Sequence, residues 1–155
     1  MSTAPDATRV LVVACKTSAS PTLLHAVRER AARGRCRFTL LVPRPCQGLH
    51  KLVDPEDQGW AEAARAIAAA SPLLEEAAGA AVLAIVGSDD PMAAIQDALN
   101  LEGFDEIILS TLPPGISRWL HIDLPSKVRG LGVPVTVVTA PMRSTGLRAA
   151  RSARA

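Results

Sequence analysis

The sequence has 155 residues, of which 48% are apolar and 21% are charged, which indicates one folded domain with its own core and excludes an intrinsically disordered chain. The net charge is +2, but the last 15 residues hold four arginines and no acidic residue, so the rest of the chain carries −2 and predicts no basic face. With two Trp, two Phe and no Tyr, the chain also lacks the aromatic side chains of a base-stacking nucleic-acid surface.

The cysteines indicate the cellular compartment, and the composition of the two terminal segments indicates the limits of the domain. Cys15, Cys36 and Cys46 are odd in number and show no paired spacing, which predicts reduced thiols in a cytoplasmic protein. No secretory signal is visible, and no apolar run reaches the about 18 residues of a membrane-spanning helix. We expect a flexible N-terminus over residues 1–7, one domain over 8–140 and a basic, disordered tail over 141–155.

The first half of the chain alternates apolar runs with helical segments. Residues 9–15 (RVLVVAC) and 37–43 (RFTLLVP) are typical of strands buried on both faces. Between these runs, Ser20 can cap a helix, Pro21 fits its first position and Gly34 can end it.

A longer helix is predicted to begin at Asp54-Pro55. Pro72 interrupts its pattern, so we expect a kink or a restart at this point. Its apolar face is expected to carry Trp60, Ala64, Ile67 and Leu74.

The second half of the chain continues the alternation. Residues 80–87 (AAVLAIVG), 105–110 (DEIILS) and 133–139 (VPVTVVT) are predicted strands. A helix from Asp90-Pro91 to about Gly103 separates the first two of these, and a segment ending near Gly130 separates the last two. The pattern predicts an α/β, Rossmann-like fold, with one doubly wound sheet of five parallel strands and helices on both faces.

The loops after the first and fourth strands are the first candidates for a ligand site. In an open parallel sheet, ligands bind beyond the carboxyl ends of the strands, where the strand order reverses. Ser117 can cap a short helix that begins at Arg118, and Lys16 and Arg118 could add positive charge for an anion there. The alternative is that Ser117 is only a helix cap and Arg118 only a solvated side chain.

The segment 103–138, GFDEIILSTLPPGISRWLHIDLPSKVRGLGVPVTVV, resembles the C-terminal half of universal stress proteins. That family typically shows an aspartate-led strand, then Gly-x2-Gly-x9-Gly-Ser/Thr, a helix and a final Pro-Val strand. The match runs through Asp105, GISRWL and Pro134-Val135. The resemblance covers roughly residues 8–140 and implies the strand order 3-2-1-4-5.

The departures from the family's nucleotide-binding pattern are specific. Ser110 stands where the family has its first glycine, and Leu112 or Pro113 stands where it has its second. Ile122-Asp123 replaces the closing Gly-Ser pair, and Lys16 replaces the aspartate after the first strand. Pro113 and Pro114 have no N–H to donate to a phosphate, and Asp123 would place a carboxylate near the phosphate position. The motif is therefore degenerate, and ATP binding in the family's manner is not expected.

The candidate cleft combines the ends of the first two strands with the loop after the fourth. Its residues are Ala14, Lys16, Val42, Ser110, Gly115, Ser117, Arg118 and Asp123. No cofactor is expected there, and ATP or AMP is the alternative.

Catalytic and metal sites find little support in the sequence. There is no Gly-x-Ser-x-Gly elbow, and the pair Ser110 and His121 has no orienting acid beyond Asp123. We therefore expect no enzymatic activity, and hydrolase activity is kept as the alternative. Cys46 with His50 does not complete a zinc site, and Asp90 before Pro91 fits a helix cap better than a magnesium ligand.

We therefore predict a non-enzymatic, cytoplasmic, stress-associated or regulatory protein; the resemblance supplies the words stress and dimer. The alternative is a protein that binds an adenine nucleotide or another small anion in the candidate cleft. The last strand is an apolar edge without charge, which favours pairing of two copies through Val133, Val135 and Val137. We also expect a further protein partner and no contact with a membrane. Nucleic acid would bind only weakly, through the basic tail.

Overall fold

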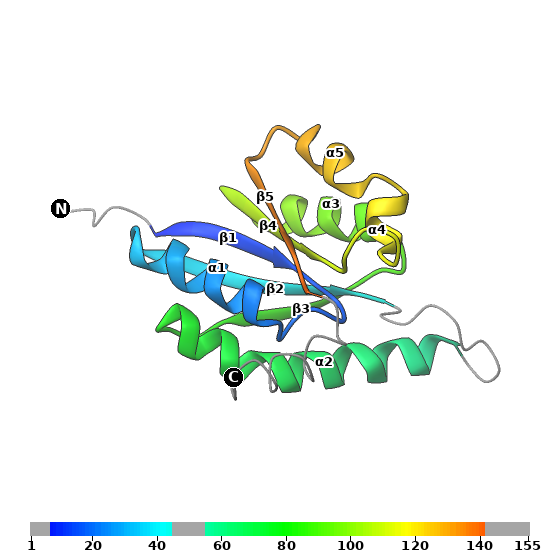
Figure 1. Ribbon diagram of the computed structural model, residues 1–155, viewed down its shortest axis with the longest axis horizontal. Coiled ribbons are helices and arrows are strands. Elements are labelled where there is room, and N and C mark those ends of the chain that lie inside the picture. The colour runs from blue at the N-terminus through cyan, green and yellow to red at the C-terminus, as the bar shows by residue number, and fades with distance from the viewer. Residues whose placement is uncertain (1–6, 45–54, 142–155) are drawn as a thin grey trace, which may run out of the picture.

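Five parallel strands form the centre of the protein (Figure 1). The computed structural model describes residues 7–44 and 55–141. The strands are β1 (Thr8–Val13), β2 (Cys36–Pro43), β3 (Leu83–Gly87), β4 (Glu106–Thr111) and β5 (Val135–Thr139). Their order is β3-β2-β1-β4-β5, and each neighbouring pair is parallel. The predicted fold class and strand order are thus confirmed.

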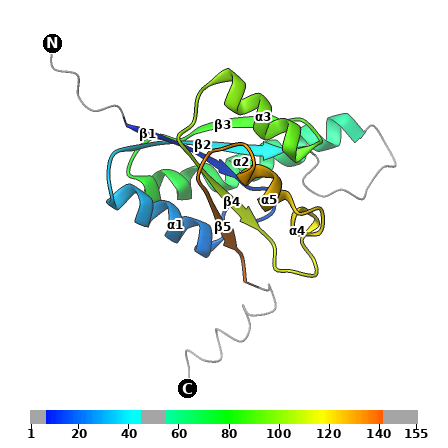
Figure 2. The same cartoon turned by 90° about the horizontal axis from the view of Figure 1, so that it is seen from above.

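Helices cover both faces of this sheet, as Figures 1 and 2 show from two directions. They are α1 (Pro21–Ala32), α2 (Pro55–Ala78), α3 (Pro91–Leu101), α4 (Arg118–His121) and α5 (Leu124–Arg129). Buried side chains of α1 and α2 pack on one face, and those of α3 and α5 pack on the other. The segment between β4 and β5 therefore forms two short helices, with α4 directly after the loop that follows β4.

Two of the helix starts follow the predicted cap-and-proline pattern. The Ser20 hydroxyl accepts a hydrogen bond from the Leu23 amide at 3.3 Å, and the Asp90 carboxylate accepts one from the Met92 amide at 3.1 Å. Each cap satisfies an amide that the first turn of the helix leaves without a partner. The cap predicted at Asp54 lies outside the described residues.

Helix α2 differs from the prediction in two respects. It is a single helix of 24 residues that runs through Pro72, so the predicted restart is wrong. Pro72 has no amide hydrogen, so the Ala68 carbonyl loses its usual helical hydrogen bond. Both residues are exposed, so this carbonyl can bind water instead. The buried stripe of the helix consists of Ala63, Ala70, Leu74 and Ala77.

The two residues that were wrongly placed on this stripe are Trp60 and Ala64. Ala64 is exposed, and the Trp60 side chain is 49% exposed, with its ring centroid 4.5 Å from the Arg44 guanidinium carbon. Alanine occurs on every side of α2, so the apolar pattern alone does not fix which side faces the sheet.

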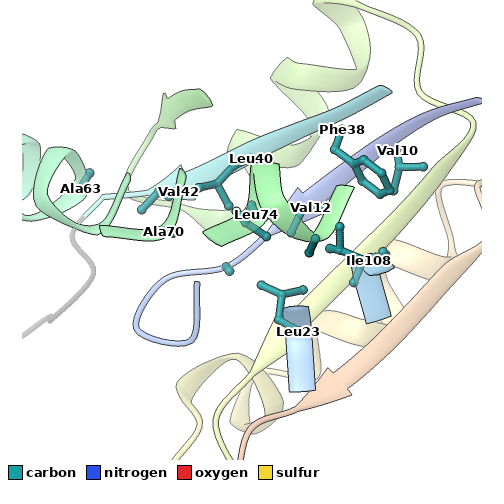
Figure 3. Packing of buried hydrophobic residues seen from close by; sticks show 13 residues of the cluster. Val10, Val12, Leu23, Phe38, Leu40, Val42, Ala63, Ala70, Leu74 and Ile108 are labelled. Carbon is teal, nitrogen blue, oxygen red and sulfur yellow. The ribbon is translucent and has the colours of Figure 1, made fainter. Parts of the chain in front are cut away.

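The strands contribute alternate side chains to two separate cores. From β1, Val10 and Val12 enter the core under α1 and α2, while Leu11 and Val13 enter the core under α3 and α5. Figure 3 shows the first core, in which side chains from three strands meet those of α1 and α2. Burial on both faces explains why the strands read as continuous apolar runs.

Several predictions concern segments that the structure does not describe. The predicted terminal segments lie outside the described residues except for Ala7 and Pro141, and so do Cys46 and His50. Across residues 7–44 and 55–141, no helix is both long and apolar enough to cross a membrane.

Candidate functional site

The candidate cleft lies where the strand order reverses. β1 has β2 on one side and β4 on the other, and Val13 is in register with Leu109. The loops after β1 and β4 therefore leave the sheet side by side, which is the place where open α/β sheets bind ligands.

A buried pair of hydroxyl groups joins these two loops. The Thr17 and Ser110 hydroxyl oxygens are 2.7 Å apart, and the two residues are only 5% and 1% exposed. The loop after β1 is held in this position by its own turn, in which the Ser20 amide donates to the Thr17 carbonyl at 3.0 Å. The loops after β1 and β4 are thus joined by two buried side chains at the carboxyl ends of these strands.

Sequence reasoning included Ser110 in the cleft but missed Thr17. The two residues are 93 positions apart in the chain, and neither belongs to a spacing motif that could have paired them. The only signal was their common place just after strands that the topology makes neighbours.

The loop after β4 folds onto itself. The Pro113 carbonyl accepts hydrogen bonds from the amides of Ile116, at 3.2 Å, and Ser117, at 3.1 Å. Pro113 and Pro114 have no amide hydrogen to donate. Gly115 lies at the exposed tip with a φ of +96°, a conformation that favours glycine. Four of the five residues from 113 to 117 thus offer no free backbone donor to an anion.

Ser117 is a helix cap, as predicted. Its hydroxyl accepts a hydrogen bond from the Leu120 amide at 3.1 Å, and the residue is 6% exposed. Arg118 and Lys16 are exposed, and neither has an ion-pair partner within the described part of the chain. These two side chains are the positive charges that the candidate cleft can offer.

The remaining residues of the predicted cleft fall into two groups. Ala14 and Val42 are fully buried in the core under α1 and α2, so they form its floor at most. Asp123 is exposed, and it is the one non-glycine residue with a positive φ, +56°, among those described. Its side chain makes no cap hydrogen bond to α5, and its backbone conformation is one that favours glycine.

A second hydroxyl at the end of β4 was also missed. Thr111 is 2% exposed, and its hydroxyl has no hydrogen-bond partner among the described residues. Because side chains alternate along a strand, Thr111 points to the opposite face of the sheet from Ser110.

The chemistry of nucleophiles and metals is limited in this region. The Ser110 hydroxyl is bonded to Thr17 rather than to His121, which is exposed on α4. In the described ranges, no three His, Cys, Asp or Glu side chains are grouped to hold a metal ion.

The cysteines depart from the prediction of reduced thiols. Cys15, directly after β1, is disulfide-bonded, so the prediction is wrong for this residue. Cys36 is a free thiol, and its partial burial raises its pKa more than the nearby Arg30 and Arg33 lower it.

The edge strand β5 begins at Val135, two residues later than predicted, because Val133 and Pro134 precede it. Val133, Val135 and Val137 all pack against the core under α3 and α5. Among the strands of the described residues, β5 pairs only with β4, so within residues 7–44 and 55–141 its outer edge has no partner strand.

The fold and the site can now be compared with known proteins. No protein-family model matches the sequence, and neither does any curated protein. The structure is similar to that of a universal stress protein from Archaeoglobus fulgidus, with a TM-score of 0.60 and 18% identity over 84% of this chain and 93% of that one.

Two further solved structures were determined with a nucleotide. A universal stress protein family protein from Arabidopsis thaliana with AMP bound gives a TM-score of 0.59 and 14% identity, and covers 89% of this chain and 95% of that one. A universal stress protein in complex with cAMP gives 0.58 and 13%, over 86% of this chain and 98% of that one. The chain therefore has the universal stress protein fold over most of its length.

Proposed function

We propose that this protein is a non-enzymatic, stress-associated regulatory module that does not bind ATP in the usual manner of this fold. The observation that carries the proposal is the buried hydrogen bond between Thr17 and Ser110. This bond joins the two loops between which a nucleotide would enter. In the loop after β4, most backbone amides are either absent, at the prolines, or already hydrogen-bonded within the loop, so they cannot bind a phosphate.

The hydroxyl pair makes nucleotide entry unfavourable for an energetic reason. A ligand that separates the loops must break the hydrogen bond and provide new partners for both hydroxyls. A buried hydroxyl left without a partner costs about 1–3 kcal/mol. This cost corresponds to roughly a 5- to 150-fold loss of affinity.

The second candidate function is binding of a small anion, such as an adenine nucleotide, at the rim of the same cleft. Two structural neighbours contain AMP or cAMP, which supports this candidate. Lys16 and Arg118 are exposed and unpaired within the described residues, so they would supply the charge. Such a ligand would bind outside the hydroxyl pair rather than between the loops.

Thermal unfolding with ATP, AMP or cAMP separates the two candidates. A ligand present at ten times its Kd stabilises the folded state by about 1.4 kcal/mol, which raises the Tm of a chain of this size by about 3–6 °C. For the proposed function we expect the Tm to rise by less than about 1 °C with each nucleotide at about 1 mM, well below this range.

A rise of several degrees that disappears in Arg118→Ala but persists in Arg129→Ala would favour the second candidate and contradict the first. Arg129 is a suitable control because it is also exposed but lies on α5. The non-enzymatic part is tested separately with generic phosphate and acyl esters, for which we expect no turnover.

A further inference from the structure

Four exposed arginines gather at the opposite end of the sheet from the cleft. Arg28 lies on α1, Arg33 and Arg35 lie in the turn after it, and Arg37 lies on β2. We call these four residues the arginine rim. Figure 1 shows that α1 ends, and β1 and β2 begin, at this same end of the molecule.

The arginine rim makes no ion pair within residues 7–44 and 55–141. Arg30, which interrupts the series, binds Glu106 through Nε at 2.9 Å and through a terminal nitrogen at 2.6 Å. None of the four rim arginines has an ion-pair partner in the described ranges.

Three carboxylates at this end of the sheet are already engaged, whereas Glu76 and Glu102, at the ends of α2 and α3, are exposed and form no ion pair within the described residues. Glu106 belongs to Arg30, and Glu29 lies 3.2 Å from the His25 imidazole. Asp105 accepts a hydrogen bond from the Arg9 amide at 2.9 Å and lies 4.0 Å from the Arg9 guanidinium.

The fold also places a like charge beside the arginine rim. Arg37 is directly in register with Arg9 on the neighbouring strand, so both side chains leave the same face of the sheet. Like charges directly opposite each other destabilise a strand pair. An anionic partner would remove this repulsion, whereas the single carboxylate of Asp105 faces Arg9 alone.

We propose that the arginine rim docks the phosphate backbone of a nucleic-acid duplex. All four residues are arginines, whose planar guanidinium groups bind phosphate oxygens in pairs. Trp60, the exposed large aromatic side chain among the described residues, lies beside Arg44, after the carboxyl end of β2 and away from the rim. The rim therefore offers no ring to stack on single-stranded bases.

Contacts of this kind depend on phosphates and not on base sequence. Binding should therefore weaken steeply as salt rises. The proposal goes beyond the proposed function and does not depend on it, because the arginine rim and the cleft lie at opposite ends of the sheet.

The test uses the full chain and a labelled 20-base-pair DNA duplex, with Kd measured by fluorescence anisotropy between about 50 and 200 mM salt. The rim variant carries Arg33→Gln, Arg35→Gln and Arg37→Gln. We expect it to bind at least tenfold more weakly at the lower salt, and its slope of log K against log salt to be smaller by about 3, since each phosphate contact contributes about 0.9.

Two matched variants keep the test specific. The control variant carries Arg65→Gln, Lys127→Gln and Arg129→Gln, which removes the same charge from other exposed positions, and we expect it to retain most of the affinity. The tail variant carries Arg143→Gln, Arg148→Gln, Arg151→Gln and Arg154→Gln, and we expect it to keep the dependence on the arginine rim. Circular dichroism melting verifies that each variant is folded.

Four outcomes would overturn the proposal. They are no binding of the wild type to the duplex at the lowest salt, equal losses in the rim and control variants, loss of all binding in the tail variant alone, and rim-dependent binding of phosphatidylserine vesicles without binding of the duplex.

Discussion

Gly87 shows how little space one residue leaves where β3 turns into α3. A Cβ added at this position would lie 2.6 Å from the Ala94 Cβ and 3.0 Å from the Leu41 Cδ1, and both neighbours are buried. Neither can move without disturbing the core under α3, so one extra methyl group overpacks it.

We therefore expect Gly87→Ala to lower the free energy of unfolding by about 1–3 kcal/mol, measured by urea denaturation. Gly34→Ala is the matched control, because a Cβ at Gly34 would meet no atom within 4 Å. It should change stability by less than about 0.5 kcal/mol. Similar unfolding midpoints for both variants would show that the approach of α3 to β3 is looser than described.

Single residues were predictable where their role is local. Ser20, Asp90 and Ser117 cap helices that start within three residues of them, so the chain near each cap contains the whole pattern. Thr17 was missed because its partner is 93 residues away. The positive φ of Asp123 was missed for a similar reason, since the turn between α4 and α5 imposes it.

At the level of elements, the Arg30–Glu106 ion pair fastens α1 to β4. The hydrogen bonds from Arg30 lower the pKa of Glu106, and this effect outweighs the opposing effect of burial. A carboxyl with a lower pKa in the folded state stabilises the protein above its unfolded pKa. That stabilisation is lost as the pH falls from about the ordinary value of 4.5 through the lowered one.

Glu106→Gln should therefore lower stability by about 1–2 kcal/mol at neutral pH, and the difference from the wild type should shrink as the pH falls below about 4.5. Urea denaturation at several pH values between 3 and 7 measures this dependence. Glu29→Gln, an exposed carboxyl on α1, serves as the control and should show a smaller difference. A gap for Glu106→Gln that stays constant with pH would contradict the ion-pair explanation.

The elements themselves were predicted well where apolar and polar residues contrast. All five strands were found this way, whereas the starts of α1, α2 and α3 were found from the cap-and-proline pattern. The buried side of α2 was not predicted, because alanine is common on both sides of the helix, with four alanines exposed and three buried. Its orientation is set by contacts with β2 and β3, which the local sequence does not contain.

For the whole molecule, the unpaired edge of β5 leads to a prediction about assembly. We propose that two copies pair through this strand, because an apolar edge without charge is normally covered. Light scattering after size exclusion should give a dimer at micromolar concentration.

Thr136 is exposed on β5, so Thr136→Lys should place a charge at the interface and yield a monomer. Leu83→Lys makes the same change on β3, the other edge strand, and should leave the dimer intact. A monomeric wild type, or dissociation by Leu83→Lys alone, would show that β5 is not the interface.

The global charge misled the sequence analysis at this scale. The chain without its last 15 residues has a net charge of −2, yet five arginines fall within residues 28–37. Only the fold shows that four of them stay unpaired within the described residues while Arg30 is neutralised by Glu106 from a distant strand. The strand order, by contrast, was predictable because it follows from the alternation of strands and helices together with the family resemblance.

The central position of β1 has a consequence for synthesis on the ribosome. β1 pairs with β2 and with β4, and 68 residues separate the end of β2 at Pro43 from the end of β4 at Thr111. At about 5–20 residues per second, one side of β1 lacks its partner for roughly 3–14 s after β2 has emerged. During this interval an apolar strand is exposed to other nascent chains, so the N-terminal third of the protein is where chaperone binding should be strongest.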